Sequence, residues 1–228
     1  MTELDHQLSR AGRPTISQRR LHWLSLVDVI LLPALILWFI WKLQFTTRWT
    51  WVLFPAWLMA SFFLHRDTPH TLGMRADNLW QATRQSLVVF GSFVVGLVVF
   101  GLVLASPREM PEHLASWHRL WSYFAFCLLQ QVALNSLLHN RMLSLVHREW
   151  LAAGLTGAIF ALCHWPNPVL VPLTFVGGSA MAWLFGRARN IIPLAIGQAL
   201  IGSLAFWAFP IAWQHHLRVG PGYYSGWR

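Results

Sequence analysis

Seven long apolar stretches, separated by short polar or charged ones, constrain this chain more than any other feature. They fall at residues 22–43, 49–65, 85–106, 118–139, 149–164, 168–186 and 190–213. A helix needs about 20 apolar residues to cross the hydrocarbon core of a bilayer, and charges within that length are costly. The pattern predicts an all-α fold, a polytopic membrane helical bundle of about seven transmembrane helices. The second and fifth stretches are short, so six or eight spans remain open.

The charge content supports the same interpretation. The 228 residues are 56% hydrophobic and only 11% charged, whereas a soluble domain carries about a quarter charged residues. The 15 tryptophans fit a membrane protein, because indole rings favour membrane–water interfaces. The formal net charge of +9 is distributed over short loops without a basic stripe. The expected surroundings are therefore a lipid bilayer, and nucleic acid is not an expected partner.

The N-terminal 20 residues are polar and basic, with Arg10, Arg13, Arg19 and Arg20, and they lack the apolar region of a signal peptide. We expect them to form a cytosolic tail. In a seven-span arrangement more Lys and Arg residues lie on the side of this tail than on the other side, which favours a cytosolic N terminus. The predicted localisation is an integral protein of a bacterial inner membrane.

Polar residues inside apolar stretches are costly in lipid, and they mark functional or helix-bridging positions. Gln130, Gln131 and Asn135 lie in one stretch, His164 in the next, and Gln198 in the last. On a helix Gln131 and Asn135 share a face, whereas Gln130 points about 100° away. One interpretation is hydrogen bonding between helices, in which each Asn or Gln side chain contributes about 1 kcal/mol. Three sites on three late helices favour a shared polar cavity instead.

Two further residues of the apolar stretches leave alternatives open. Cys127 lies near the polar side of its helix, three residues before Gln130. It is either a small buried hydrophobe, which we favour, or a thiol paired with His164. Asp28 is either the counter-ion of a buried Arg or His, or a residue at the cytosolic end of the first span. Its position seven residues after Leu21 favours the second interpretation.

The order and spacing of these polar residues resemble the CPBP family of intramembrane endopeptidases, which includes the type II CAAX prenyl proteases (Rce1-like) and bacterial immunity (Abi) proteins. The family pattern has Glu-Glu-x-x-x-Arg, then Phe-x-x-x-His, then His-x-x-x-Asn or His-x-x-x-Asp. Here Gln130–Gln131 stands at the glutamate pair and Asn135 at the arginine. Phe160-Ala-Leu-Cys-His164 matches the second motif completely. Gln198-Ala-Leu-Ile-Gly202 stands at the third. The sequence context after His164, HWPNP and then IIPLAIGQAL, also looks like this family.

The resemblance implies hydrolysis of a peptide bond, in which a glutamate and the motif histidine activate water. A glutamine amide cannot serve as the base near neutral pH, so the proton would go to His164. Gln130 or Gln131 would then hold the water, and Gln198 would donate a hydrogen bond to the oxyanion. Gly202 lacks the family's Asn side chain, although Ser203 is adjacent. The loss of the arginine at Asn135 matches the loss of the carboxylates, because no counter-charge is needed.

Two hypotheses of function follow from the resemblance. In the first, the chain is an intramembrane peptidase that processes membrane-associated or lipidated proteins or peptides through the altered site. In the second, it is a catalytically inactive relative that binds a membrane partner, peptide or lipid in the same cavity. A transporter or channel is less favoured, because no series of charged residues lines a path. We predict no metal and no cofactor, since His164 and the cysteines Cys127 and Cys163 are the only strong donors in view.

The sequence divides into four parts. These are a cytosolic basic tail (1–20), N-terminal membrane helices and a loop (21–84), the CPBP-like membrane core (85–213) and a C-terminal tail (214–228). Both cysteines lie in apolar stretches, so we expect no disulfide framework.

Overall fold

The computed structural model describes residues 16–47, 49–104 and 111–224. It is 83% helical, and these residues contain no strand, so the predicted all-α fold is confirmed. Arg10 and Arg13 of the expected cytosolic tail, and the last four residues of the C-terminal tail, lie outside the described part.

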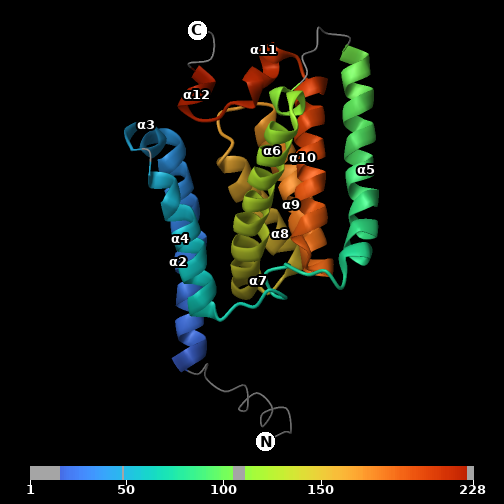
Figure 1. The fold of residues 1–228 in the computed structure, drawn as a ribbon. Helices are drawn as coiled ribbons and strands as arrows, with labels where there is room; N and C mark the ends of the chain where they lie inside the picture. The colour runs from blue at the N-terminus through green and yellow to red at the C-terminus, as the bar shows by residue number, and fades with distance from the viewer. Residues whose placement is uncertain (1–15, 48, 105–110, 225–228) are drawn as a thin grey trace, which may run out of the picture.

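The helical elements correspond closely to the seven apolar stretches. In chain order they are α2 (Ile16–Trp38), η1 (Phe39–Leu43), α3 (Gln44–Thr46), η2 (Thr50–Val52), α4 (Leu53–His65), α5 (Leu79–Leu104), η3 (Glu112–Ala115), α6 (Trp117–Gln131), η4 (Val132–His139), α7 (Asn140–Val146), α8 (Glu149–Leu162), α9 (Leu170–Ala188), α10 (Ile191–Ala208), α11 (Ile211–Gln214), η5 (His215–Leu217) and α12 (Pro221–Tyr224). Long helices run alternately up and down the molecule (Figure 1). The first residues of α2 and the short helix α12 lie at opposite ends (Figure 1).

Three helical segments of the described chain are long and apolar enough to cross a membrane, namely Gln18–Thr46, Leu79–Leu104 and Ile191–Ala208. The expected seven spans are therefore not confirmed. Thr50–His65 and Glu149–Leu162 are apolar but shorter. A helix of 14 residues, such as α8, is only about 21 Å long, against about 30 Å of hydrocarbon. The continuous helix α6–η4–α7 is long enough, but it carries the polar residues described below.

The helices form two groups. α2 and α4 lie side by side at one edge of the molecule, and α5 to α10 form the rest (Figure 1). In the second group α8 packs against α9, and α5 packs against α10. One buried apolar core connects the two groups, and its members include Leu32, Phe62, Phe90, Leu137, Phe160, Phe185 and Leu194. Many large apolar side chains face outward, such as Phe63, which is 83% exposed, and Val103, which is 75% exposed. Such outward apolar surfaces suit contact with lipid.

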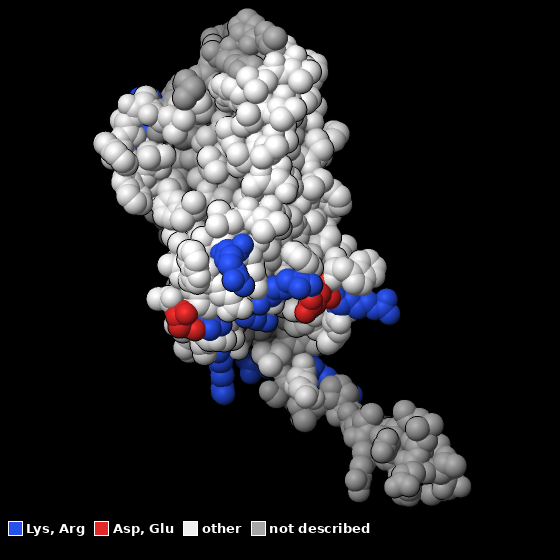
Figure 2. All heavy atoms as spheres, turned by 90° about the vertical axis from the view of Figure 1, so that its right-hand side faces the viewer, with Lys and Arg blue, Asp and Glu red and all other residues white. Residues whose placement is uncertain are grey.

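The basic residues gather at the end of the bundle where α2 begins (Figure 2). The members on the described chain are Arg19, Arg20, Arg66, Arg75, Arg84, Arg141, Arg148, Arg187 and Arg189. Only Lys42, Arg119 and Arg218 of the described residues belong to the opposite end. Arg75 hydrogen-bonds Asp77 in the loop before α5, which holds the pKa of the Asp77 carboxyl below its usual value.

The loop between α4 and α5 is bound to the helix ends. Arg66 takes a left-handed conformation (φ 56°) that ends α4. Gly73 (φ 74°) accepts a hydrogen bond from the Ile191 amide at 3.1 Å, and a Cβ on Gly73 would lie 2.5 Å from the Phe185 ring. Asn140 donates to the Thr71 carbonyl at 2.9 Å. These contacts hold the start of α10, and with it Gln198, in a fixed register against η4.

Several element boundaries differ from the expected ones, such as the start of α2 at Ile16 and the end of α7 at Val146, and two of them have a local reason. α5 begins at Leu79 instead of residue 85, because the polar first turns of this helix do not show in an apolar pattern. α10 ends at Ala208 instead of residue 213. Phe209 has the extended conformation that a following proline favours, and α11 begins at Ile211, directly after Pro210.

Candidate functional site

The helix that carries Gln130 and Gln131 changes geometry directly after them. α6 is capped by Ser116, whose side chain accepts a hydrogen bond from the Arg119 amide. Its last residue is Gln131, and the wider π-helix η4 follows and contains Asn135. Short π-helical segments within α-helices are frequent at functional sites. The periodicity of the sequence predicts an ordinary α-helix here, so the π-helix is a feature that the sequence analysis missed.

Four amide side chains meet between α6, η4 and α10. Gln131 donates from Nε2 to Gln198 Oε1 at 2.5 Å, and Gln198 donates from Nε2 to Gln130 Oε1 at 2.6 Å. Asn135 donates from Nδ2 to Gln131 Oε1 at 2.5 Å. We call Gln130, Gln131, Asn135 and Gln198 the amide cluster. Gln130 therefore joins the same site as Gln131, although the two point about 100° apart on the helix.

The amide cluster is uncharged, and Gln131 and Asn135 are buried whereas Gln130 and Gln198 are half-buried. Gln131 and Asn135 have no exposed surface, and Gln131 Nε2 also lies 3.0 Å from the sulfur of Met181 on α9. Asn135 Oδ1 is buried and has no hydrogen-bond partner among the described residues. An amide neither accepts nor releases a proton near neutral pH, so the amide cluster can orient a hydrogen-bonding group but cannot act as a base.

His164 lies in the turn after α8, and its side chain bonds the last turn of that helix. Its Nδ1 lies 2.7 Å from the Phe160 carbonyl oxygen. Because a carbonyl only accepts, this bond assigns the proton to Nδ1 and leaves Nε2 as the unprotonated nitrogen. The two rings of the Phe160–His164 motif also meet edge to face, with centroids 4.6 Å apart. In the described chain no hydrogen bond joins His164 to the amide cluster.

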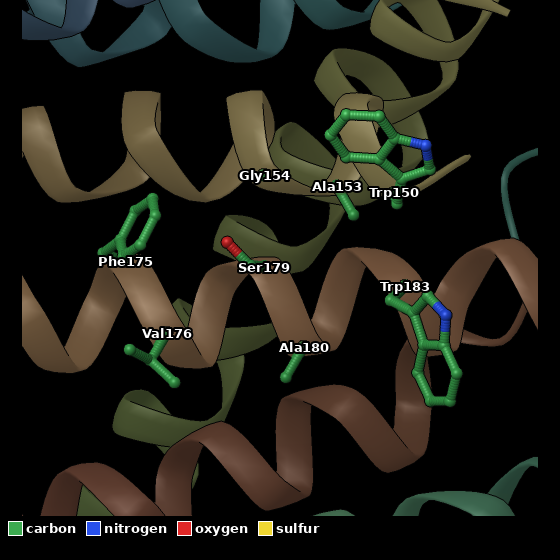
Figure 3. Close-up of a pocket in the computed structure, with 8 residues that line it drawn as sticks. All are labelled: Trp150, Ala153, Gly154, Phe175, Val176, Ser179, Ala180 and Trp183. Atoms are coloured by element: carbon green, nitrogen blue, oxygen red, sulfur yellow. The ribbon is translucent and has the colours of Figure 1, made fainter. Parts of the chain in front are cut away.

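α8 and α9 approach each other closely around the motif phenylalanine. A Cβ on Gly178 would lie 3.0 Å from the Phe160 ring, and a Cβ on Gly157 would lie 2.1 Å from Ser179 Oγ. These glycines let the two backbones meet, and Phe160 is held between α8 and α9 as a result. On the outer side the two helices form a groove lined by Trp150, Ala153, Gly154, Phe175, Val176, Ser179, Ala180 and Trp183 (Figure 3).

The remaining predicted residues lie on the same two helices as the amide cluster. Cys127 is buried on α6, and both cysteines are free thiols. Ser203 donates to the Ala199 carbonyl of its own helix at 2.8 Å. At Gly202 a Cβ would lie only 2.2 Å from the Tyr123 hydroxyl. Tyr123 of α6 therefore occupies the space beside the position where the family pattern has Asn or Asp.

The interpretation that Asp28 only marks the cytosolic end of its span is wrong. Asp28 is buried, and its Oδ2 lies 3.2 Å from Arg141 Nε and 2.5 Å from Ser61 Oγ. Arg141 also pairs with Asp67 at 2.5 Å, and His65 Nδ1 lies 3.7 Å from Asp28 Oδ2. Asp28 is thus a counter-ion of a buried arginine. Because both charges are buried, each side chain needs the other as its counter-charge, and an unpaired charge in this position would be costly.

Two residues that lie against the site were not identified from the sequence. Met181 is one of many apolar residues on α9, and nothing local distinguishes it. Tyr123 lies four residues before Cys127 and eight before Gln131, so helical spacing alone could have placed it on the polar side of α6. Among the described residues, no group of three His, Cys, Asp or Glu side chains could hold a metal ion.

Comparison with known proteins places the family on the core of the chain. Residues 116–204 match the family model described as Type II CAAX prenyl endopeptidase Rce1-like. This range runs from the cap of α6 into α10 and includes the amide cluster, Phe160 and His164. The resemblance inferred from the sequence is confirmed over this range, which is narrower than the expected 85–213. No curated protein and no solved structure matches the chain.

Proposed function

We propose that this CAAX-protease-like membrane protein, whose residues 116–204 form an Rce1-like core, binds membrane-associated or lipidated proteins or peptides at the amide cluster without the family's glutamate-dependent hydrolysis. The observation that carries the proposal is the continuous chain of hydrogen bonds from Asn135 through Gln131 and Gln198 to Gln130, which leaves the buried Asn135 Oδ1 able to accept a further hydrogen bond. The cluster offers neutral hydrogen-bonding groups, and the sequence resemblance aligns Gln130 and Gln131 with the family's catalytic glutamate pair. Neutral amides are also less costly within a membrane than carboxylates.

A second candidate function is peptide hydrolysis with His164 as the base. It is favoured by the Nδ1 bond to the Phe160 carbonyl, which leaves Nε2 able to accept a proton from water. Gln130 or Gln131 would hold the water, and Gln198 would donate to the oxyanion. This route requires the substrate to bring a carbonyl between His164 and the amide cluster.

One assay separates the two functions. The full chain is reconstituted in liposomes with a fluorescent, prenylated CAAX peptide, and binding is followed by anisotropy while cleavage is followed by mass spectrometry. We expect saturable binding that weakens about tenfold in Gln198→Leu, because the partners of Gln198 lose their hydrogen bonds. Gln81→Leu is the matched control, since Gln81 is exposed on α5.

Each outcome of this assay decides between the functions. Cleavage by the wild type that is lost in His164→Ala would establish hydrolysis and contradict binding without cleavage. Binding without cleavage, unchanged in His164→Ala, would exclude the histidine mechanism. A wild type that neither binds nor cleaves the peptide would reject both functions for prenylated substrates.

The same proposal includes a bacterial inner membrane and a cytosolic N terminus. It is supported by the basic residues at the end of the bundle where α2 begins (Figure 2). Lys and Arg are enriched on the cytosolic side of membrane proteins. The opposite end, with α11 and α12, would then face the outside.

A further inference from the structure

A cavity at the end of the bundle near α11 and α12 is separate from the amide cluster. Its volume is about 640 Å³, within the range of about 300–1,000 Å³ that small-ligand sites occupy. Helices α5 and α9 and the segment after α10 supply its walls. The lining residues include Phe93, Leu173, Val176, Phe209, His215 and Tyr223. None of the amide-cluster residues lines it.

The cavity is apolar at one end and polar at the other. Phe93 lies eleven residues before Leu104, the last residue of α5, which places it about 16 Å along the helix from that end. This depth is about half of a bilayer's hydrocarbon core. His215 and Tyr223 instead follow the end of α10, where the chain leaves the bundle. With the end of α5 placed at the headgroup level of a bilayer, the cavity would run from that level into the hydrocarbon.

His215 brings a buried polar atom to the lining of this cavity. Its Nδ1 is buried and has no hydrogen-bond partner in the part of the chain that the structure describes. The ring stacks on Tyr223 with centroids 4.2 Å apart. His215, His216 and Leu217 all have positive φ, at 46°, 53° and 52°. Strained backbone of this kind persists where the surrounding structure holds it, and it concentrates at ligand sites.

The segment that carries His215 is fixed to the rest of the fold. Asn167, in the turn after His164, donates from Nδ2 to the carbonyls of Gln214 at 2.7 Å and Arg218 at 3.1 Å. The Gly220 amide donates to the Trp165 carbonyl at 3.0 Å. These bonds bracket His215 on both sides, so its orientation toward the cavity is determined by the core and not by a free tail.

We propose that this cavity binds a bilayer lipid, with one acyl chain along Phe93, Leu173 and Val176 and an oxygen of its polar part hydrogen-bonded to His215 Nδ1. The occupant must come from the membrane, because the apolar end of the cavity lies at the depth of the hydrocarbon. It must also carry a hydrogen-bonding group close to one end of a chain, because the buried nitrogen lies where the cavity reaches the headgroup level. This site is independent of the proposed function of the amide cluster.

The test uses the full chain in nanodiscs that contain a phospholipid with a photoactivatable diazirine in one acyl chain. After illumination, labelled peptides are identified by mass spectrometry. We expect labelling of α5 and α9 peptides that line the cavity. His215→Ala should reduce that labelling about tenfold, since a buried group loses its hydrogen bond. Ala212→Trp, which fills the cavity from its rim, should abolish it.

His216→Ala is the matched control. His216 also has positive φ, but it lies beside Phe206, with ring centroids 6.2 Å apart, and it does not line the cavity. Labelling in this variant should stay within about twofold of the wild type. Equal labelling in the wild type, His215→Ala and Ala212→Trp would overturn the proposal, because the lipid would then be part of the general annulus. Thermal unfolding of each variant checks that it is folded.

Discussion

At the residue scale, the side chains that the sequence resemblance aligns with the family's motif positions fit one another in space. Asn135 stands where the family has an arginine, and it donates to Gln131, which stands where the family has a glutamate. An amide–amide bond thus takes the place of a charged pair. The same holds at Gly202, where the family has Asn or Asp, because Tyr123 occupies the space that a side chain would need.

Gly202→Ala should destabilise the protein by about 1–3 kcal/mol, because its Cβ would lie 2.2 Å from the Tyr123 hydroxyl. Tyr123→Phe removes that oxygen, and the next ring atom is 3.5 Å away. In the double variant most of the loss should therefore disappear. Unfolding by denaturant in micelles measures the four members of this cycle. Gly96→Ala on α5 is the control, since its Cβ meets no atom within 4 Å. Additive losses for Gly202→Ala and Tyr123→Phe would contradict the close contact.

At the scale of elements, the turn after His164 organises the C-terminal segment. Asn167 is fully buried, and its Oδ1 accepts from the amides of Val169 and Leu170 at 3.0 Å while its Nδ2 holds two carbonyls of the segment. One side chain thus caps α9 and binds α11 and η5. The residues from 214 to 224 are consequently part of the folded core in this structure, although their sequence is that of an irregular tail.

Asn167→Ala should increase the rate of hydrogen exchange across residues 211–220 more than elsewhere in the chain. The carbonyls of Gln214 and Arg218 lose their donor, and an unsatisfied buried group costs on the order of 1–3 kcal/mol. Exchange measured by mass spectrometry in micelles compares this variant with Thr83→Ala, whose hydroxyl bonds only its own helix. Unchanged protection of the segment in Asn167→Ala would show that other contacts hold it.

At the scale of the whole molecule, a buried ion cluster joins the two groups of helices. Asp28 of α2 and Asp67, which follows α4, both pair with Arg141 of α7. The side chains of the Asp28–Arg141 pair are each only 6% exposed. The cluster therefore fixes the α2–α4 pair, which lies outside the matched family range, onto the Rce1-like core.

Arg141→Met should lower the free energy of unfolding by about 3–5 kcal/mol, because it leaves two buried carboxylates without a counter-charge. Neutralising these carboxylates in the triple variant with Asp28→Asn and Asp67→Asn should restore part of the loss. Arg75→Met is the matched control. Its ion pair with Asp77, which is 66% exposed, should leave the free energy of unfolding almost unchanged, because solvent screens exposed pairs. Equal effects of Arg141→Met and Arg75→Met would disprove the structural role of the cluster.

The proposed orientation also concerns the whole molecule. Alkaline phosphatase is active only outside the cytosol, so it reports the side of a fusion point. A fusion after Met74, in the loop between α4 and α5, should be inactive, and a fusion after Thr47, between α3 and η2, should be active. The reverse pattern would contradict a cytosolic N terminus and the positive-inside arrangement of the arginines.

The sequence by itself indicated the helical segments and the resemblance to the Rce1-like family over residues 116–204, because apolar length and motif spacing are local properties. Helical periodicity also paired Gln131 with Asn135. Only the tertiary structure decided the partners of Gln198, which is 67 residues from Gln131, and of Asp28, which is 113 residues from Arg141. Such contacts depend on how helices pack, and no local pattern encodes them. The register of α10 against α6 brought Gln130 into the amide cluster, whereas His164, in the turn after α8, bonds the Phe160 carbonyl one turn before it.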